Sequence, residues 1–170
     1  MAVSQCLSNS EEWPNVHVTT FLDEISFDAL AAYDDSVSGE PRSSLLNKWI
    51  FESNGNSWVA VDKTGKIVGY IVYHALLKNK SKKKKYRISP LFADDPLTVK
   101  HLLKAVVDYC SASEEHADTA ILRFRFPSAN PEALELCKAL KGEFADTLVK
   151  MYTEGAKEQD ISRTYIYCPY

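Results

Sequence analysis

The chain has 170 residues, of which 45% are hydrophobic and 25% are charged, and its formal net charge is −3. This is the composition of an ordinary globular domain that is large enough to bury a core, and no apolar run is long enough to span a bilayer. The four cysteines form neither a Cys-x-x-Cys pair nor a Cys/His ligand spacing. This pattern argues against a metal site and favours reduced thiols in an intracellular protein.

Residues 1–15 are expected to form a flexible leader and residues 16–170 a single domain. The leader lacks the basic start and apolar core of a secretion signal, so a cytoplasmic location is expected. The domain begins with a predicted strand over 16–22, helices over 27–37 and 41–52, and strands over 58–62 and 67–74. The residues Lys63-Thr-Gly-Lys66 between the last two strands are typical of a β-hairpin turn.

A block of six lysines follows, at positions 78, 80, 82, 83, 84 and 85. Such a block is typical of a solvated hairpin tip, where the charges also discourage pairing of sheet edges. Nuclear import and binding to an anionic surface stay open as alternatives. Nucleic-acid binding is not expected as the main function, because no other basic segment adds to the block.

The second half of the chain alternates strands and helices. The predicted elements are a short strand over 86–89 that ends at Pro90, a helix over about 97–112, a strand over 119–126, a helix from Asn130-Pro131 to Gly142, and strands around 144–152 and 162–167. The complete order is β-α-α-β-β-β-α-β-α-β-β. This order predicts a mixed α/β domain with a central mixed sheet of about seven strands and four helices.

The order resembles the GNAT N-acetyltransferase fold, and short motifs carry the resemblance. The segment 58–70 (WVAVDKTGKIVGY) looks like the second and third strands of that family, and the segment 130–144 (NPEALELCKALKGEF) is similar to its Asn-x-x-Ala-x-x-Leu motif. A finer resemblance is to the C-terminal GNAT-like domain of YitH-type proteins. It rests on Tyr33-Asp34, Val37, Gly39, Arg42, Leu46 and Trp49-Ile50, followed by Pro90-Leu-Phe-Ala-Asp94.

The resemblance implies acyl transfer from acetyl-CoA, or another acyl-CoA, to a small-molecule amine. It implies that backbone groups of Ile88, Ser89 and Leu91 hold the thioester and that Asn130 touches the pantetheine arm. The family's glycine-rich loop, which binds the pyrophosphate, corresponds here to residues 93–99, which contain no glycine. We expect Asp94 or Asp95 to cap the following helix instead, which weakens binding of acetyl-CoA or CoA.

Two residues are candidates for proton transfer. His74, late in a predicted strand, belongs to the residue type that accepts a proton near neutral pH. Cys137 stands where the family often has the tyrosine that protonates the leaving thiolate, and a thiol can donate a proton there. For both residues a purely structural role is the alternative.

Three arginines are candidates for substrate binding. Arg123 and Arg125 are two positions apart in a predicted strand, so both point to one face of the sheet. The resemblance places this strand beside the one that carries Arg87. Neighbouring guanidinium groups can bind a carboxylate or phosphate of a ligand, or they can pair with acidic residues of the chain.

The sequence therefore predicts a GNAT-like N-acyltransferase with a degenerate cofactor loop. The alternative is a catalytically inactive GNAT-like module that binds a ligand or a protein partner. This alternative is favoured by the missing glycines of the loop, the missing tyrosine and the missing strand glutamate of the family. Neither a metal nor a membrane is expected as a partner, and a homo-oligomer stays open.

Overall fold

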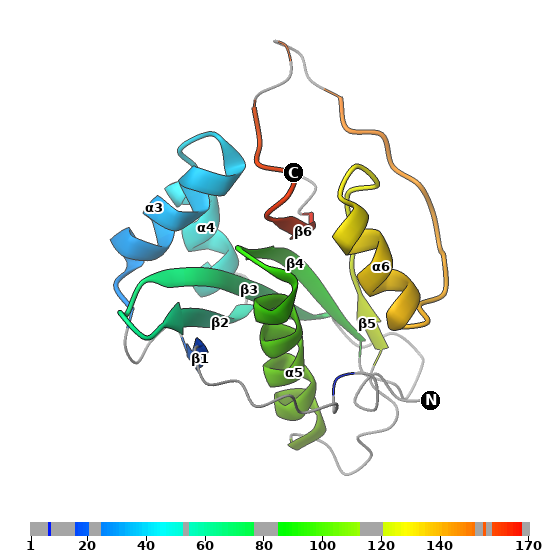
Figure 1. Cartoon of the computed structure of the whole chain (residues 1–170), viewed down its shortest axis with the longest axis horizontal. Helices are drawn as coiled ribbons and strands as arrows, with labels where there is room; N and C mark the ends of the chain where they lie inside the picture. The colour runs from blue at the N-terminus through cyan, green and yellow to red at the C-terminus, as the bar shows by residue number, and fades with distance from the viewer. Residues whose placement is uncertain are drawn as a thin grey trace.

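The computed structural model describes Leu7 and residues 16–20, 25–52, 55–76, 85–112, 121–151, 155 and 158–167. Within these ranges the chain forms a mixed sheet of six strands (Figure 1). Helices α3 and α4 cover one face of this sheet, and helices α5 and α6 lie against the other (Figure 1). The predicted mixed α/β class is therefore confirmed.

The strands and helices follow the predicted order closely. The strands are β1 (Val16–Thr20), β2 (Gly55–Asp62), β3 (Ile67–Leu76), β4 (Lys85–Ala93), β5 (Ile121–Arg123) and β6 (Thr164–Ile166). The helices are α3 (Phe27–Ser38), α4 (Ser43–Asn47), which continues into the π-helical turn η1 (Lys48–Glu52), α5 (Pro96–Ala112) and α6 (Pro131–Ala139). None of the helices in the described ranges is long and apolar enough to cross a bilayer.

The strand order places β4 at the centre of the architecture. The sheet runs β1-β2-β3-β4-β5, and β6 also pairs with β4. Among the described strands, β4 and β5 are parallel and the other neighbours are antiparallel. A parallel pair needs a crossover connection, and here the connection contains α5. β4 is therefore the strand where the antiparallel meander meets the β-α-β unit.

Local sequence signals set several element boundaries. The hydroxyl of Ser26 accepts a hydrogen bond from the amide of Ala29 and so caps α3, which ends at Gly39 with a φ of 76°. In the β2–β3 turn, the carboxylate of Asp62 accepts hydrogen bonds from the amides of Thr64 and Lys66. The hydrogen bonds from Thr64 are the main reason why the pKa of Asp62 is lowered. The predicted hairpin is therefore confirmed.

Two apolar cores lie on opposite faces of the sheet. Ile71 and Tyr73 of β3 pack in the core beneath α5, whereas Tyr70 and Val72 pack in the core beneath α3 and α4. Successive side chains of a strand point to opposite faces, so His74 points to the same face as Tyr70 and Val72. This alternation fixes the side of the sheet on which each candidate residue lies.

The predicted strand over 144–152 is wrong within residues 143–151, which the structure describes as non-strand. Its apolar side chains point to solvent: Phe144 is 80% exposed, Val149 81% and Met151 86%. None of the described strands pairs with this segment, and apolar alternation alone does not supply a hydrogen-bonding partner. The strand expected over 119–126 is likewise shorter, and only Ile121–Arg123 forms β5 in the part that is described.

The prediction that the fourth strand ends at Pro90 is also wrong, because β4 continues to Ala93. A proline is tolerated in a strand at a bulge, where no ladder hydrogen bond is required of it. The register between β3 and β4 shifts at this point, between Ile71 and Tyr73.

The lysine block lies outside the described residues except for Lys85. The expected leader also lies outside them except for Leu7, which is buried.

Candidate active site

β4 changes its pairing partner halfway along its length. Residues 85–87 pair with β5, whereas residues 91–92 pair with β6. Between them, residues 88–90 have no ladder partner on this edge among the described strands. The Ser89–Pro90 peptide bond in this stretch is cis. β5 and β6 therefore leave a gap along the edge of β4, and we call residues 88–90 the open stretch.

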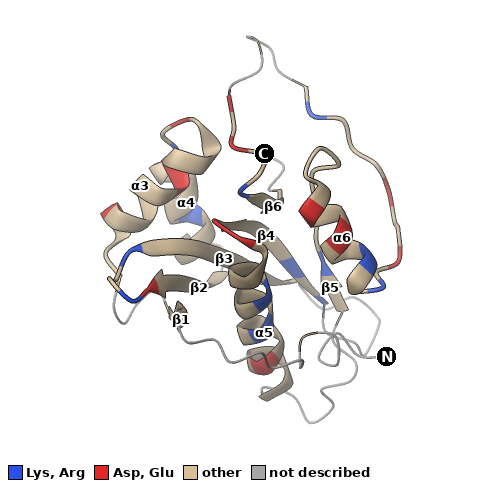
Figure 2. Cartoon of the chain, in the orientation of Figure 1, with Lys and Arg blue, Asp and Glu red and all other residues tan. Residues whose placement is uncertain are grey.

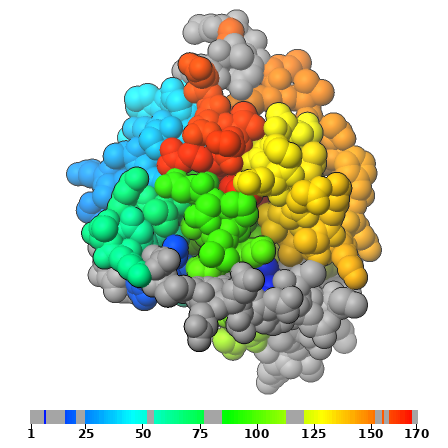
Figure 3. Space-filling view, viewed as in Figure 1, coloured from blue at the N-terminus to red at the C-terminus, as the bar shows by residue number. Residues whose placement is uncertain are grey.

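The C-terminal segment 158–167 lies against the second half of β4. In the space-filling view this segment, drawn in red, fills the region between α3, α5 and α6 (Figure 3). In addition to the pairing of β6, the amide of Ala93 donates a hydrogen bond of 3.0 Å to the carbonyl oxygen of Arg163. Leu91, which the sequence assigned to thioester binding, is the register partner of Ile166. Its backbone is therefore engaged by the chain itself.

Asn130 caps α6 and holds the C-terminal segment at the same time. Its Oδ1 accepts hydrogen bonds from the first amides of α6, as predicted for an N-cap. Its Nδ2 lies within 3.2 Å of the carbonyl oxygens of Ile161, Ser162 and Thr164. Only 1% of Asn130 is exposed. Contact between Asn130 and a pantetheine arm stays a prediction, and it requires the C-terminal segment to move, because the amide group is already satisfied.

Asp95 satisfies the amides at the start of α5. Its Oδ1 accepts hydrogen bonds from the amides of Leu97 and Thr98 at 2.8 and 2.9 Å, and its Oδ2 accepts one from the Thr98 hydroxyl at 2.7 Å. The sequence predicted this cap for Asp94 or Asp95, and the structure assigns it to Asp95. A carboxylate that already occupies a helix N-terminus leaves no amides for a phosphate. In this arrangement the start of α5 does not fit a pyrophosphate.

Asp94 binds the C-terminal segment instead. Its Oδ1 lies 2.7 Å from Nε of Arg163 and 3.0 Å from the hydroxyl of Tyr33. The Arg163 guanidinium also lies 4.9 Å from the centre of the Tyr33 ring. Burial, assisted by the Asp94 carboxylate, raises the pKa of Tyr33 well above its usual value, so this hydroxyl stays protonated as a donor. The three side chains join α3, the start of α5 and β6.

The structure brings His74, Arg87 and Arg123 together. His74 of β3 is the register partner of Arg87 in β4, and Arg87 is the register partner of Arg123 in β5. Register partners share a face of the sheet, and Figure 2 shows basic residues on adjacent lengths of β4 and β5. Arg87 and Arg123 are exposed, because α3 and α4 cover this face only over other parts of the sheet. Arg125 lies two residues beyond Arg123.

Cys137 lies elsewhere, on α6. Its neighbours Leu136 and Leu140 pack against the core on the α5 side of the sheet, the face opposite to that of His74. Cys137 is half-buried, and burial raises the pKa of its thiol. The structure therefore does not place the candidate acid beside the candidate base, and the role of Cys137 stays a prediction.

A buried ion pair beneath this face was not predicted as a unit. Arg42 forks onto Asp34, with Nε 2.6 Å from Oδ2 and Nη2 2.7 Å from Oδ1, and the hydroxyl of Tyr70 donates a hydrogen bond to Asp34. The Arg42 guanidinium also packs over the rings of Trp49 and Phe92. Asp34 and Arg42 both belong to the pattern that carried the finer resemblance, in which seven residues separate them. Apart from this spacing, no feature of the sequence indicated that the two side chains pair.

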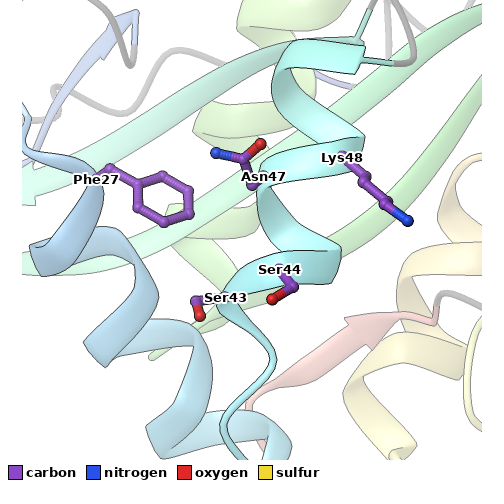
Figure 4. Close-up of a pocket in the computed structure, with 5 residues that line it drawn as sticks. All are labelled: Phe27, Ser43, Ser44, Asn47 and Lys48. Atoms are coloured by element: carbon purple, nitrogen blue, oxygen red, sulfur yellow. The ribbon is translucent and has the colours of Figure 1, made fainter.

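One surface pocket lies away from these residues. Phe27, Ser43, Ser44, Asn47 and Lys48 line it, between the beginnings of α3 and α4 (Figure 4). None of the predicted site residues contributes to this pocket. Among the described residues, no group of three or more His, Cys, Asp or Glu side chains is arranged to hold a metal ion.

A mixed sheet with helices on both faces, in which β5 and β6 pair with different parts of β4, defines a mixed α/β class of protein, and comparisons identify the family. Residues 30–168 match the family model described as "Acetyltransferase (GNAT) domain". This match covers most of the chain. The chain therefore belongs to the GNAT acetyltransferase family. A search of curated protein sequences finds no significant match.

Solved structures of GNAT proteins share the fold. A ribosomal-protein-alanine N-acetyltransferase from Brucella melitensis biovar Abortus 2308 superposes with a TM-score of 0.57 at 11% identity, over 80% of this chain and 98% of that chain. An aminoglycoside acetyltransferase from an uncultured soil metagenomic sample, in complex with sisomicin, has a TM-score of 0.55 at 19% identity, over 83% and 95%. A Trypanosoma brucei acetyltransferase has a TM-score of 0.55 at 15% identity, over 81% and 99%. At these identities the likeness shows the fold alone.

Proposed function

We propose that this protein is an N-acyltransferase that moves the acyl group of acetyl-CoA, or of another acyl-CoA, to a small amine. The observation that carries the proposal is the open stretch of β4, which begins one residue after Arg87. Neither β5 nor β6 pairs with this stretch, so its edge could receive a thioester once the C-terminal segment has moved. The membership of the chain in the GNAT family supports this use of the gap.

In the proposed reaction the amine nitrogen attacks the thioester carbonyl carbon, a C–N bond forms and the C–S bond breaks. The amine loses one proton, which we assign to His74, the register partner of Arg87 beside the open stretch. The leaving thiolate takes up one proton, which we assign to Cys137. Burial raises the pKa of this thiol, so Cys137 carries a proton at neutral pH, which is the state that a proton donor requires.

The donor reaches the open stretch only after the C-terminal segment moves. Residues 88–90 are buried, and β6 pairs with the residues that follow them. Asp95 and Asp94 add a second obstacle, because their carboxylates stand where a pyrophosphate would need amides and positive charge. We therefore expect acyl-CoA to bind more weakly than it would at a glycine-rich loop.

A second candidate function is a catalytically inactive GNAT-like module that binds a ligand or a protein partner. One observation favours it: the chain itself satisfies the start of α5 and the second half of β4. An inactive module would keep this closed arrangement permanently, whereas an enzyme has to leave it in order to bind its donor.

Calorimetric titration of acetyl-CoA and free CoA into the purified protein separates the two candidates. The double variant Asp94→Gly/Asp95→Gly tests the obstacle, and Glu143→Gly/Asp146→Gly, which removes two exposed carboxylates elsewhere, is its control. Micromolar binding by the wild type, followed by thiol release with an amine panel, is the result expected for the enzyme. Absence of binding up to millimolar concentration in the wild type, with binding gained only in the first variant, would support the inactive module.

A further inference from the structure

We propose that the acceptor is an amine that also carries an anionic group, either a carboxylate or a phosphate, and that Arg87 and Arg123 bind this group. The inference names the acceptor class of the proposed acyl transfer and rests on that function. It starts from the pairing of β4 and β5, which sets these two arginines side by side in register.

The pair is costly without a ligand. Strands in a sheet lie about 4.8 Å apart, so two guanidinium groups in register on one face repel each other. Both residues are exposed, and Arg125 follows two positions beyond Arg123, just after the end of β5. Lys85 adds a further positive charge on this face, two positions before Arg87. The domain therefore concentrates positive charge on one part of a chain whose net charge is −3.

Nothing in the described part of the chain neutralises this cluster. Among the ion pairs of the described residues, none involves Arg87, Arg123 or Arg125, and no side-chain hydrogen bond of theirs is formed there. The other two arginines of the chain, Arg42 and Arg163, each bind an aspartate. Guanidinium groups bind carboxylates and phosphates in a forked, bidentate geometry, so an anionic ligand would supply the missing partner.

The position of the cluster limits the size of the acceptor. Arg87 directly precedes the open stretch, and a strand rises by about 3.3 Å per residue. An anionic group held by Arg87 and Arg123 would therefore lie a few bonds from an amine that reaches the thioester. His74, the register partner of Arg87 on its other side, lies on the same face as the proposed acceptor. The geometry fits a short amino acid or a short phosphorylated amine.

The first test measures kcat/KM for thiol release by the full chain with acetyl-CoA and matched amines. β-Alanine is compared with β-alaninamide, and phosphoethanolamine with ethanolamine, so the two arms distinguish carboxylate from phosphate. We expect one anionic member to be preferred at least tenfold, mainly through KM. Equal use of the charged and uncharged members of both pairs would overturn the inference while leaving the acyl transfer intact.

Variants assign the preference to the two arginines. Arg87→Gln and Arg123→Gln are each expected to reduce it about tenfold, as the loss of a charge-assisted pair implies, and Arg87→Lys is expected to retain part of it. Lys100→Gln, an equal charge change on α5, should leave it unchanged. Because each preference is compared between wild type and variant, the different basicities of the amines cancel. A preference that survives in Arg87→Gln/Arg123→Gln would contradict the inference.

A second readout does not depend on catalysis. Glutarate and inorganic phosphate, which lack an amine, are expected to raise the Tm of the wild type but not of Arg87→Gln/Arg123→Gln. A shift of this kind without acyl transfer to any amine would overturn the proposed function while supporting an anion site at these arginines. Absence of the shift, together with a flat amine preference, would overturn the site itself.

Discussion

Arg163 and Asp94 join the C-terminal segment to the end of β4. Both Nε and Nη2 of Arg163 lie 2.7 Å from Oδ1 of Asp94. Arg163 directly precedes β6, and Asp94 directly follows β4. The side chains are 25% and 28% exposed, so water only partly screens the pair. This contact holds the C-terminal segment against the end of β4.

Breaking this pair should loosen the C-terminal segment without unfolding the domain. Arg163→Gln is expected to lower the free energy of unfolding by about 1 kcal/mol, the scale of a partly exposed ion pair. Urea denaturation of Arg163→Gln, Asp94→Asn and the double variant gives the coupling energy. Hydrogen exchange should be faster at the amide of Ala93, which donates to the Arg163 carbonyl. Additive effects of the two changes would show that the residues do not interact in solution.

Local signals in the sequence predicted much of the framework. Apolar residues at helical spacing located α3, and the Asn130-Pro131 pair located the start of α6. The turn at 63–66 fixed the hairpin. These features depend on residues close together in the chain, which a sequence displays directly.

The packing of the C-terminal segment against β4 could not be predicted in the same way. Asp94 and Arg163 are 69 positions apart in the sequence, and no short motif predicts a contact over such a separation. The hydrogen bonds from Asn130 to residues 161–164 could not be predicted either. The cap that Asn130 forms on α6 depends on nearby residues, whereas these hydrogen bonds join residues that are distant in the sequence. The absence of a strand over 143–151 has the same origin: pairing depends on a distant partner rather than on the segment's own pattern.

The ion pair of Asp34 and Arg42 should contribute much more to stability than an exposed pair. Their side chains are only 1% and 8% exposed. Removing one partner leaves a buried charge unpaired, so Arg42→Ala is expected to lower the free energy of unfolding by about 3–5 kcal/mol. Lys104→Ala, which breaks the exposed pair with Asp108, is the control and should cost less than about 0.5 kcal/mol. Chemical denaturation measures both, and similar losses in the two variants would contradict the prediction.

Gly39 should tolerate substitution less well than Gly65, although both have a positive φ. A Cβ on Gly39 would lie 1.7 Å from the carbonyl oxygen of Glu158, whereas a Cβ on Gly65 would meet nothing within 4 Å. Gly65→Ala is therefore expected to lower the free energy of unfolding by about 1 kcal/mol, which is the cost of holding a residue with a Cβ at a positive φ. Gly39→Ala adds a backbone clash with the C-terminal segment and is expected to cost about 3 kcal/mol. Equal shifts of the urea midpoint would show that this segment does not pack against the end of α3 in solution.

His101 should make the stability of the domain depend on pH. It is 3% exposed on the buried side of α5, and burial, opposed in part by the Asp95 carboxylate, lowers its pKa to about 4. In the unfolded chain its pKa is about 6.5, so between these values the unfolded state binds more protons than the folded state. The stabilising contribution is therefore complete above about pH 6.5 and is lost as the pH falls toward 4.

The variant His101→Gln isolates this effect, because all other titrating groups stay in place. Between pH 7 and pH 4.5 the wild type is expected to lose about 2 kcal/mol more unfolding free energy than the variant. The two proteins are compared by urea denaturation at both pH values, since carboxylates common to both contribute equally to each difference. If the pH profiles were parallel, His101 would titrate in the folded protein as it does in the unfolded chain, and α5 would pack more loosely against the sheet than the structure shows.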